Sequence, residues 1–145
     1  MLVPLQVYDF AGGLRIMAHL FLKAQEPHIF GPIRAIVDTG SPATIIGNGD
    51  AERMRISKIQ LKNLDTHKNP VAIGGGRMVT KVVKNAEIQI GADFKSQLMD
   101  LLVPFQSEEG SSCQPTILGV DFMEKNRLKL FFDPINKQSY FETIE

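Results

Sequence analysis

The sequence has few of the residues that characterise disulfide-stabilised, metal-binding or nucleic-acid-binding proteins. Its 145 residues include one cysteine, Cys113, which can form neither an internal disulfide nor a cysteine-based zinc site. Sixteen Lys and Arg residues balance sixteen Asp and Glu residues, so no net charge attracts nucleic acid or an anionic membrane. The three histidines, His19, His28 and His67, lack metal-ligand spacing. We therefore expect no cofactor, no metal, no nucleic-acid partner and no membrane partner.

Long hydrophobic runs are missing as well. The longest candidate, residues 98–105, is interrupted by Asp100 and Pro104, whereas a membrane span needs about 20 apolar residues. The first six residues have neither the basic start nor the apolar core of a signal peptide. These absences predict a soluble, cytoplasmic protein, in which Cys113 is more simply a passive thiol than a reactive one.

The sequence does contain many short segments of alternating polarity. Its length predicts one domain, residues 1–145, and its 43 % hydrophobic content is that of a globular chain. Strands are predicted at 14–22, 33–37, 86–90, 98–103, 128–132 and 138–144. Short helices are predicted near 50–55 and near 121–126, the second with Val120 and Met123 three residues apart. This pattern predicts an all-β, mainly antiparallel fold, a barrel or a sandwich.

Three segments carry more specific information. Asp38-Thr39-Gly40-Ser41 follows an apolar strand, although the tripeptide Asp-Thr-Gly alone usually forms a turn. Three glycines at 74–76 lie between strand-like segments, which predicts a long hairpin over residues 71–83. Ile117-Leu118-Gly119 precedes the second short helix, where the glycine allows a buried strand to pass close to another backbone.

In this order the three segments resemble the retropepsin-like aspartic proteases, the single-lobe relatives of pepsin, in their cellular and retrotransposon forms. The resemblance covers about residues 14–133. It implies a closed acid-protease barrel with a flap hairpin and one or two short helices. It also implies a homodimer, because one chain with one such motif supplies only half of an active site with two carboxylates.

The resemblance implies a role for each residue of the first motif. Asp38 would be the catalytic carboxylate, and a water molecule would be activated between the Asp38 side chains of two copies. Thr39 would bond to the partner loop, and Gly40 would bring its amide to the carboxylate. Ser41 would donate to the outer oxygen of Asp38, which would favour the ionised form and lower the optimal pH.

The other two motifs would bind a peptide or protein substrate and support the site. The flap that closes over the substrate would consist of Ile73, Gly74, Gly75, Gly76 and Arg77. Ile36 and Ile117 would line apolar pockets, or equally belong to the core. Leu118 and Gly119 would be the structural part of the third motif.

Some features depart from the resemblance or have simpler explanations. Retroviral members pair an Asp that follows the first motif with an Arg that follows the second glycine, but Pro42 and Val120 occupy these positions. The retroviral form of the dimer interface is therefore in doubt. Residues 65–67 (Asp-Thr-His) lack the motif glycine and are expected to form a surface loop. Asp121 is explained more simply as a helix N-terminal acid than as a second carboxylate.

Three functions are compatible with these features. The leading one is an aspartic endopeptidase. A non-catalytic retropepsin-fold binding or dimerisation module and a self-processing part of a larger assembly also remain open. The complete Asp38-Thr39-Gly40 motif favours the enzyme, because a degenerate module is expected to lose at least one of these residues.

Overall fold

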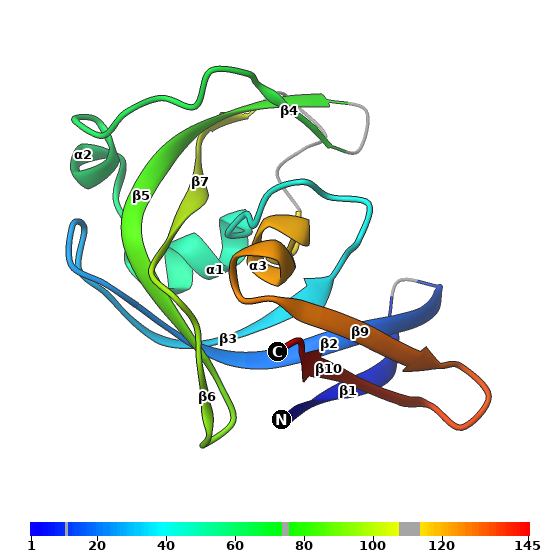
Figure 1. The fold of residues 1–145 in the computed structure, drawn as a ribbon. Coiled ribbons are helices and arrows are strands. Elements are labelled where there is room, and N and C mark those ends of the chain that lie inside the picture. Colours follow the sequence, from blue (N-terminus) through cyan, green and yellow to red (C-terminus); the bar gives the residue numbers. More distant parts are fainter. Residues whose placement is uncertain (11, 74–75, 108–113) are drawn as a thin grey trace.

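The computed structural model describes residues 1–10, 12–73, 76–107 and 114–145, which form ten strands and three short helices (Figure 1). The strands are β1 (Leu2–Phe10), β2 (Gly13–Ala24), β3 (Ile29–Val37), β4 (Val71–Ile73), β5 (Gly76–Ile90), β6 (Phe94–Lys95), β7 (Met99–Ser107), β8 (Ile117–Leu118), β9 (Leu128–Asp133) and β10 (Gln138–Thr143). The helices are α1 (Asn48–Arg53), α2 (Lys58–Leu61) and α3 (Val120–Lys125). Within these ranges no helix is long and apolar enough to cross a membrane.

The predicted all-β, mainly antiparallel class is confirmed, but the sheet is open and not a closed barrel. Its main path runs β4-β5-β2-β1-β10-β9, with β3 beside β2, and with β6 and β7 beside β5. The short β3–β8 pair is parallel, and the other strand pairs of the described chain are antiparallel. The sheet stays open because β4 and β9 each pair with one described strand, so each keeps one free edge.

Alternating residues place one face of β2 and of β3 in the core. On β3, Ile33, Ala35 and Val37 are buried, whereas Arg34 between them is exposed. Strand β7 differs, because residues 101–103 are all buried. A continuous apolar run of this kind is expected where both faces of a strand are covered.

Helix α3 packs into the core through Phe122, a residue that the sequence pattern did not identify. Val120 is exposed and Met123 is only partly buried, whereas Phe122 is 0 % exposed. The Phe122 ring lies 6.2 Å from the ring of Phe94 and 5.9 Å from that of Phe141, measured between centroids. These aromatic contacts position α3 between the sheet and the loop that follows β3.

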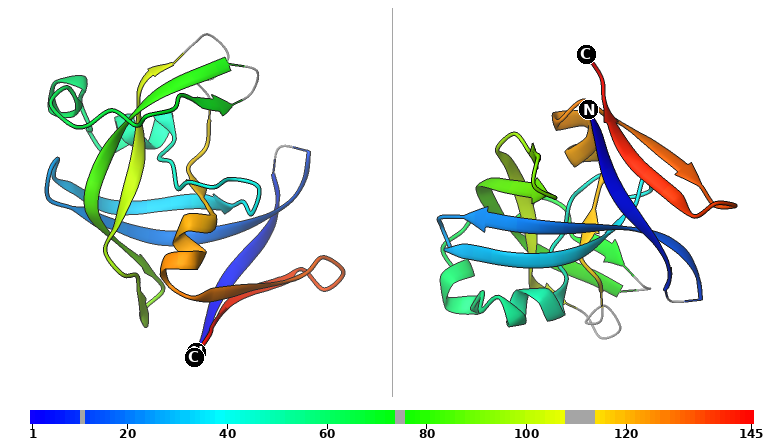
Figure 2. Two further views of the ribbon diagram at one scale, coloured as in Figure 1. Left: turned by 45° about the horizontal axis from the view of Figure 1, so that its top comes forward. Right: turned by 90° about the horizontal axis from the view of Figure 1, so that it is seen from below.

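Strand β1 and helix α2 were not predicted. Strand β1 pairs with β2 on one side and β10 on the other, and the two termini lie side by side in both views of Figure 2. The amide of Thr143 donates to the carbonyl of Met1 at 3.0 Å. Helix α2 begins with a capping box, in which Ser57 and Gln60 satisfy each other's backbone amides. That Ser-x-x-Gln spacing is the sequence signal that could have predicted the helix.

Candidate active site

The end of β3 is held against the third motif. Ile36 lies opposite Ile117, and Val37 lies opposite Leu118, in the parallel β3–β8 register. The amide of Asp38 then donates to the carbonyl of Leu118 at 3.1 Å. Two segments that are about 80 residues apart in the sequence therefore fix the backbone of Asp38 together.

Gly40 contacts the Asp38 carboxylate directly. Its amide donates to Asp38 Oδ1 at 2.8 Å, and the amide of Ser41 donates to the Asp38 carbonyl at 3.1 Å. A Cβ atom added to Gly40 would lie 3.1 Å from the same carboxylate oxygen, which is tighter than most real Cβ contacts. A glycine at this position therefore lets the loop close around the carboxylate.

The hydroxyl group of Ser41 has a different partner from the one expected. Ser41 Oγ donates to the carbonyl of Ala43 at 2.8 Å. A hydroxyl has one proton to donate, so it cannot donate to Asp38 in the same arrangement. The proposed effect of Ser41 on the Asp38 carboxyl stays a prediction, and it requires the hydroxyl to turn away from Ala43.

Gly119 is the point of closest approach between the Asp38 loop and α3. A Cβ atom added there would lie 2.4 Å from the carbonyl oxygen of Ala43 and 2.8 Å from that of Ser41. The next residue, Val120, donates its amide to the same Ser41 oxygen at 2.8 Å. Only a residue without a side chain allows these backbones to approach so closely, as the sequence predicted for this glycine.

A second connection between the loop and α3 involves Thr44, which was not predicted. Asp121 Oδ1 accepts a hydrogen bond from Thr44 Oγ1 at 2.7 Å, and Asp121 Oδ2 accepts one from the Thr44 amide at 3.0 Å. Thr44 Oγ1 in turn accepts from the amide of Gly119 at 3.1 Å. The Asp121 carboxylate also accepts from the Phe122 amide at the start of α3. Asp121 is therefore a structural, helix N-terminal acid that supports the loop.

The Asp38 loop reaches the surface of the single chain. Asp38 is half-buried, and Thr39 and Gly40 are exposed. Among the described residues, no hydrogen bond or ion pair joins Asp38 to another carboxylate, and the Thr39 hydroxyl has no hydrogen-bond partner. No group of three or more His, Cys, Asp or Glu residues in the described chain could hold a metal ion.

The hairpin predicted over residues 71–83 forms between β4 and β5. Val71 pairs with Met78, and Ile73 pairs with Gly76, while Arg77 is exposed. Gly74 and Gly75, which were assigned to the flap tip, lie outside the described residues, as does Cys113. Figure 1 places this hairpin on the same side of the molecule as the C-terminal end of β3.

The two isoleucines assigned to apolar pockets lie next to each other. Ile36 and Ile117 are register partners on β3 and β8, and both are partly buried. The structure therefore brings together Asp38, Gly40, Ile36, Ile117 and Gly119.

Comparison with known proteins agrees with this geometry. Residues 31–122 match the family model described as aspartyl protease. This range begins within β3 and ends within α3, so it contains all three motifs. No curated protein sequence matches the chain significantly.

One solved structure shows the same fold at low sequence identity, and two further structures match with lower scores. A crystal structure of a retropepsin-like aspartic protease from Rickettsia conorii superimposes with a TM-score of 0.62 at 13 % identity. The match covers 99 % of this chain and 92 % of the other. EIAV protease complexed with the inhibitor HBY-793 matches with a TM-score of 0.49 at 17 % identity, over 81 % of this chain and 90 % of that one. The retroviral protease-like domain of Ddi1 from Leishmania major gives 0.47 at 18 %, over 87 % and 94 %. The last two scores add nothing to the fold assignment.

Proposed function

Since the chain belongs to the aspartyl protease family, we propose that it is an endopeptidase whose active site forms between the Asp38 side chains of two identical copies. The observation that carries this proposal is the position of Asp38. Its carboxylate is held by the amide of Gly40 at 2.8 Å, at the exposed end of a strand that the third motif fixes. A binding module would not need a carboxylate oriented in this way.

The chemistry follows from the pairing of two carboxylates. Two like charges a few Å apart cannot both ionise easily, so the pair shares one proton, as is general for aspartic proteases. The ionised carboxylate removes a proton from a water molecule, which attacks the peptide carbonyl. The protonated carboxylate hydrogen-bonds to the carbonyl oxygen. Acid–base roles of this kind typically contribute about 10²- to 10⁴-fold each.

The surface of the single chain supports the need for a second copy. Thr39 is exposed and its hydroxyl group is available for a bond across a two-fold axis. Figure 1 shows the end of β3 and the tip of the β9–β10 hairpin on one side of the molecule. A partner placed on that side would complete the site and would also cover Thr39.

The free edge of β9 offers the contact surface for this partner. The amide of Ile144 donates to the carbonyl of Arg127 at 2.8 Å. Because antiparallel ladders alternate, the main-chain groups of Leu128, Leu130 and Phe132 point to the unpaired side. The 41 % exposed Phe132 also leaves apolar surface at this edge. Edge strands that remain unpaired normally carry charges, prolines or bulges. The lysine of β9, Lys129, pairs with Glu142 of β10 at 3.7 Å, so the stretch around Phe132 is the part of this edge that favours pairing with another chain.

The test compares the wild-type protein with Asp38→Asn on a denatured protein or peptide library between about pH 4 and about pH 7, with and without pepstatin. We expect pepstatin-sensitive cleavage by the wild type. Asp38→Asn should lose it by about 10³-fold or more, because an amide cannot act as the base. Asp93→Asn, an exposed aspartate in the β5–β6 turn, is the matched control and should stay active. Equal cleavage by the wild type and Asp38→Asn would refute the protease function.

A further inference from the structure

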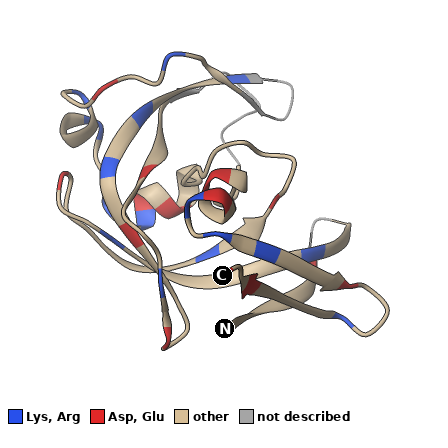
Figure 3. Ribbon diagram, viewed as in Figure 1, with Lys and Arg blue, Asp and Glu red and all other residues tan. Residues whose placement is uncertain are grey.

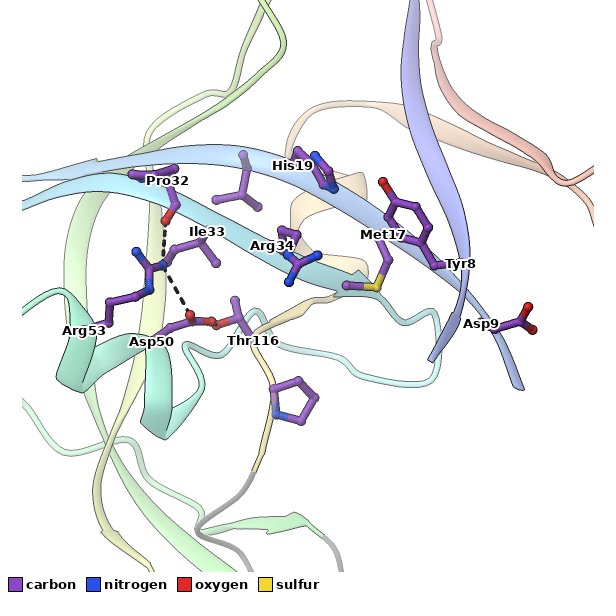
Figure 4. Close-up of a pocket in the computed structure, with 12 residues that line it drawn as sticks. Tyr8, Asp9, Met17, His19, Pro32, Ile33, Arg34, Asp50, Arg53 and Thr116 are labelled. Carbon is purple, nitrogen blue, oxygen red and sulfur yellow. Dashed lines mark hydrogen bonds and ion pairs between the residues drawn. The ribbon is translucent and has the colours of Figure 1, made fainter. Parts of the chain in front are cut away.

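A cavity of about 680 Å³ lies beside β3 and does not include Asp38 among its lining residues (Figure 4). It is bounded by β1, β2, β3, α1 and the segment that precedes β8. Its floor is apolar, because Met17, Leu20 and Ile33 line it and are themselves buried. A cavity of this size with a few polar groups around an apolar floor has the usual features of a ligand site.

The polar groups of this cavity are not all used within the chain. Asp50 Oδ2 accepts from Thr116 Oγ1 at 2.6 Å, and Asp50 Oδ1 lies 3.3 Å from Arg53. Arg53 also donates to the carbonyl of Pro32 at 2.6 Å. By contrast, the guanidinium of Arg34 makes no hydrogen bond or ion pair with any described residue. The cavity therefore contains a cation, Arg34, that has no counter-charge among the described residues.

The main chain of Arg34 is also available. The amide of Ile36 donates to the carbonyl of Thr116, which shows that even-numbered residues of β3 turn their backbone groups away from β2. Strand β8 covers this edge only at Ile36 and Val37, and Arg53 occupies the carbonyl of Pro32. The amide and carbonyl of Arg34 thus lie at an open stretch of sheet edge between α1 and residue 115.

The surroundings of Arg34 define what can bind there. His19 is the register partner of Arg34 on β2, and its ring stacks on that of Tyr8 with centroids 6.0 Å apart. Figure 4 shows Asp9 at the end of the cavity opposite to Asp50 and Arg53. An acidic group is therefore favoured at Arg34 and His19, and disfavoured near Asp9. Charges of both signs are interspersed over the rest of the molecule, so this preference is local (Figure 3).

We propose that this cavity is an accessory site for an extended, acidic segment of the substrate protein, outside the catalytic cleft. The segment pairs its main chain with Arg34 and places a carboxylate on the Arg34 guanidinium. Its neighbouring apolar side chain points to the other face of the sheet and lies over Leu20 and Ile33, which are register partners there. The inference rests on the proposed peptidase function for the identity of its ligand. One wall connects to the catalytic loop, because Thr116 is followed by Ile117 and Leu118, which pair with the end of β3.

The test uses the full chain carrying Asp38→Asn, so that binding is measured without cleavage. The probes are three blocked decapeptides that are identical except for a central Leu-Glu, Leu-Gln or Leu-Lys. We expect amide resonances of residues 17–19, 33–35 and 116 to shift on titration with the Leu-Glu peptide. Its affinity should be about tenfold or more above that of the Leu-Gln peptide, which is the usual effect of a hydrogen bond between charged groups.

Variants identify the residue responsible. Arg34→Gln should reduce the affinity for the Leu-Glu peptide to that for the Leu-Gln peptide. Lys58→Gln, the same change of charge on α2 away from the cavity, should leave it unchanged. Equal binding of the Leu-Glu and Leu-Gln peptides, an unaffected Arg34→Gln variant, or shifts confined to the β4–β5 hairpin and the Asp38 loop would overturn the inference. A wild-type protein without peptidase activity would refute the proposed function, yet leave this binding result readable.

Discussion

At the scale of single residues, the Asp38 loop depends on backbones that approach one another more closely than side chains allow. The clearest case is Gly119, whose hydrogen atoms face the carbonyls of Ala43 and Ser41. These carbonyls belong to the loop that orients Asp38. A change at Gly119 should therefore affect folding and, under the proposed function, catalysis as well.

We predict that Gly119→Ala destabilises the protein by about 1–3 kcal/mol, because the added methyl group would meet backbone atoms at 2.4 Å and the loop must shift. Activity should fall with it. The measurement is the free energy of unfolding in denaturant, with Gly49→Ala as the control. A Cβ atom at Gly49 meets nothing within 4 Å, and alanine there should be neutral or stabilise α1 by up to about 1 kcal/mol. Equal stabilities of the two variants would contradict the prediction.

The residues that could be predicted are those whose structural role depends on their neighbours in the sequence. Gly40 and Gly119 stand out because glycine next to an apolar strand indicates a turn or a close approach. Thr44 gave no such signal, since its partner Asp121 lies 77 residues away and the hydrogen bond between them exists only in the folded chain. For Ser41 the sequence indicates a position in the motif but not the hydrogen-bond partner. A hydroxyl group can turn to several acceptors, and in the structure it donates to the carbonyl of Ala43.

At the scale of elements, the turn of the β9–β10 hairpin contains Asp133, a carboxyl group whose pKa is clearly shifted. The side chain of Asn136 donates to Asp133 Oδ2 at 2.7 Å, and the amides of Asn136 and Ile135 donate to Asp133 Oδ1. These bonds, led by that from the Asn136 side chain, lower the pKa of Asp133 from its ordinary value near 3.8. The contribution of the carboxylate to the turn is therefore complete above the ordinary pKa and is lost as the pH falls through the lowered one.

Asn136→Ala should raise the pKa of Asp133 toward its ordinary value, because the largest cause of the shift is removed. The pKa can be followed by the carboxyl carbon resonance during an acid titration. Asn63→Ala, at an exposed position remote from this hairpin, serves as the control and should leave the Asp133 titration in place. An unchanged Asp133 pKa in Asn136→Ala would show that the backbone amides alone hold the carboxylate.

Elements were predictable to the extent that their pattern was regular. Strands β2 and β3 alternate cleanly and were expected close to their observed positions. Strand β1 was missed, although Val3 and Leu5 are both buried, because Pro4 between them cannot donate to a ladder and weakens a strand assignment. Pro4 is accommodated opposite Tyr140 in the register with β10.

At the scale of the whole molecule, two features support the proposed dimer. The sheet does not close on itself, because β9 keeps a free edge, and the chain presents a single Asp38 motif at its surface. A closed barrel was expected from the resemblance, and no pattern within one chain indicates whether its last strands pair internally or with a neighbour. Under the proposed function, one symmetric contact would pair the open edge and complete the site, because each copy would supply the same strand and the same carboxylate.

The last prediction concerns this contact. Phe132→Lys should raise the dimer dissociation constant by about tenfold or more, because a lysine on an edge strand opposes pairing with another chain. Phe30→Lys places the same charge at another exposed aromatic residue, on β3, and should leave association unchanged. Sedimentation equilibrium gives the dissociation constants, and peptidase activity measured over the same concentrations should follow the dimer fraction in all three proteins. If Phe132→Lys lost activity while remaining as dimeric as the wild type, the β9 edge would not be the interface. Full activity in a strictly monomeric protein would contradict the shared site itself, since one chain supplies only one Asp38.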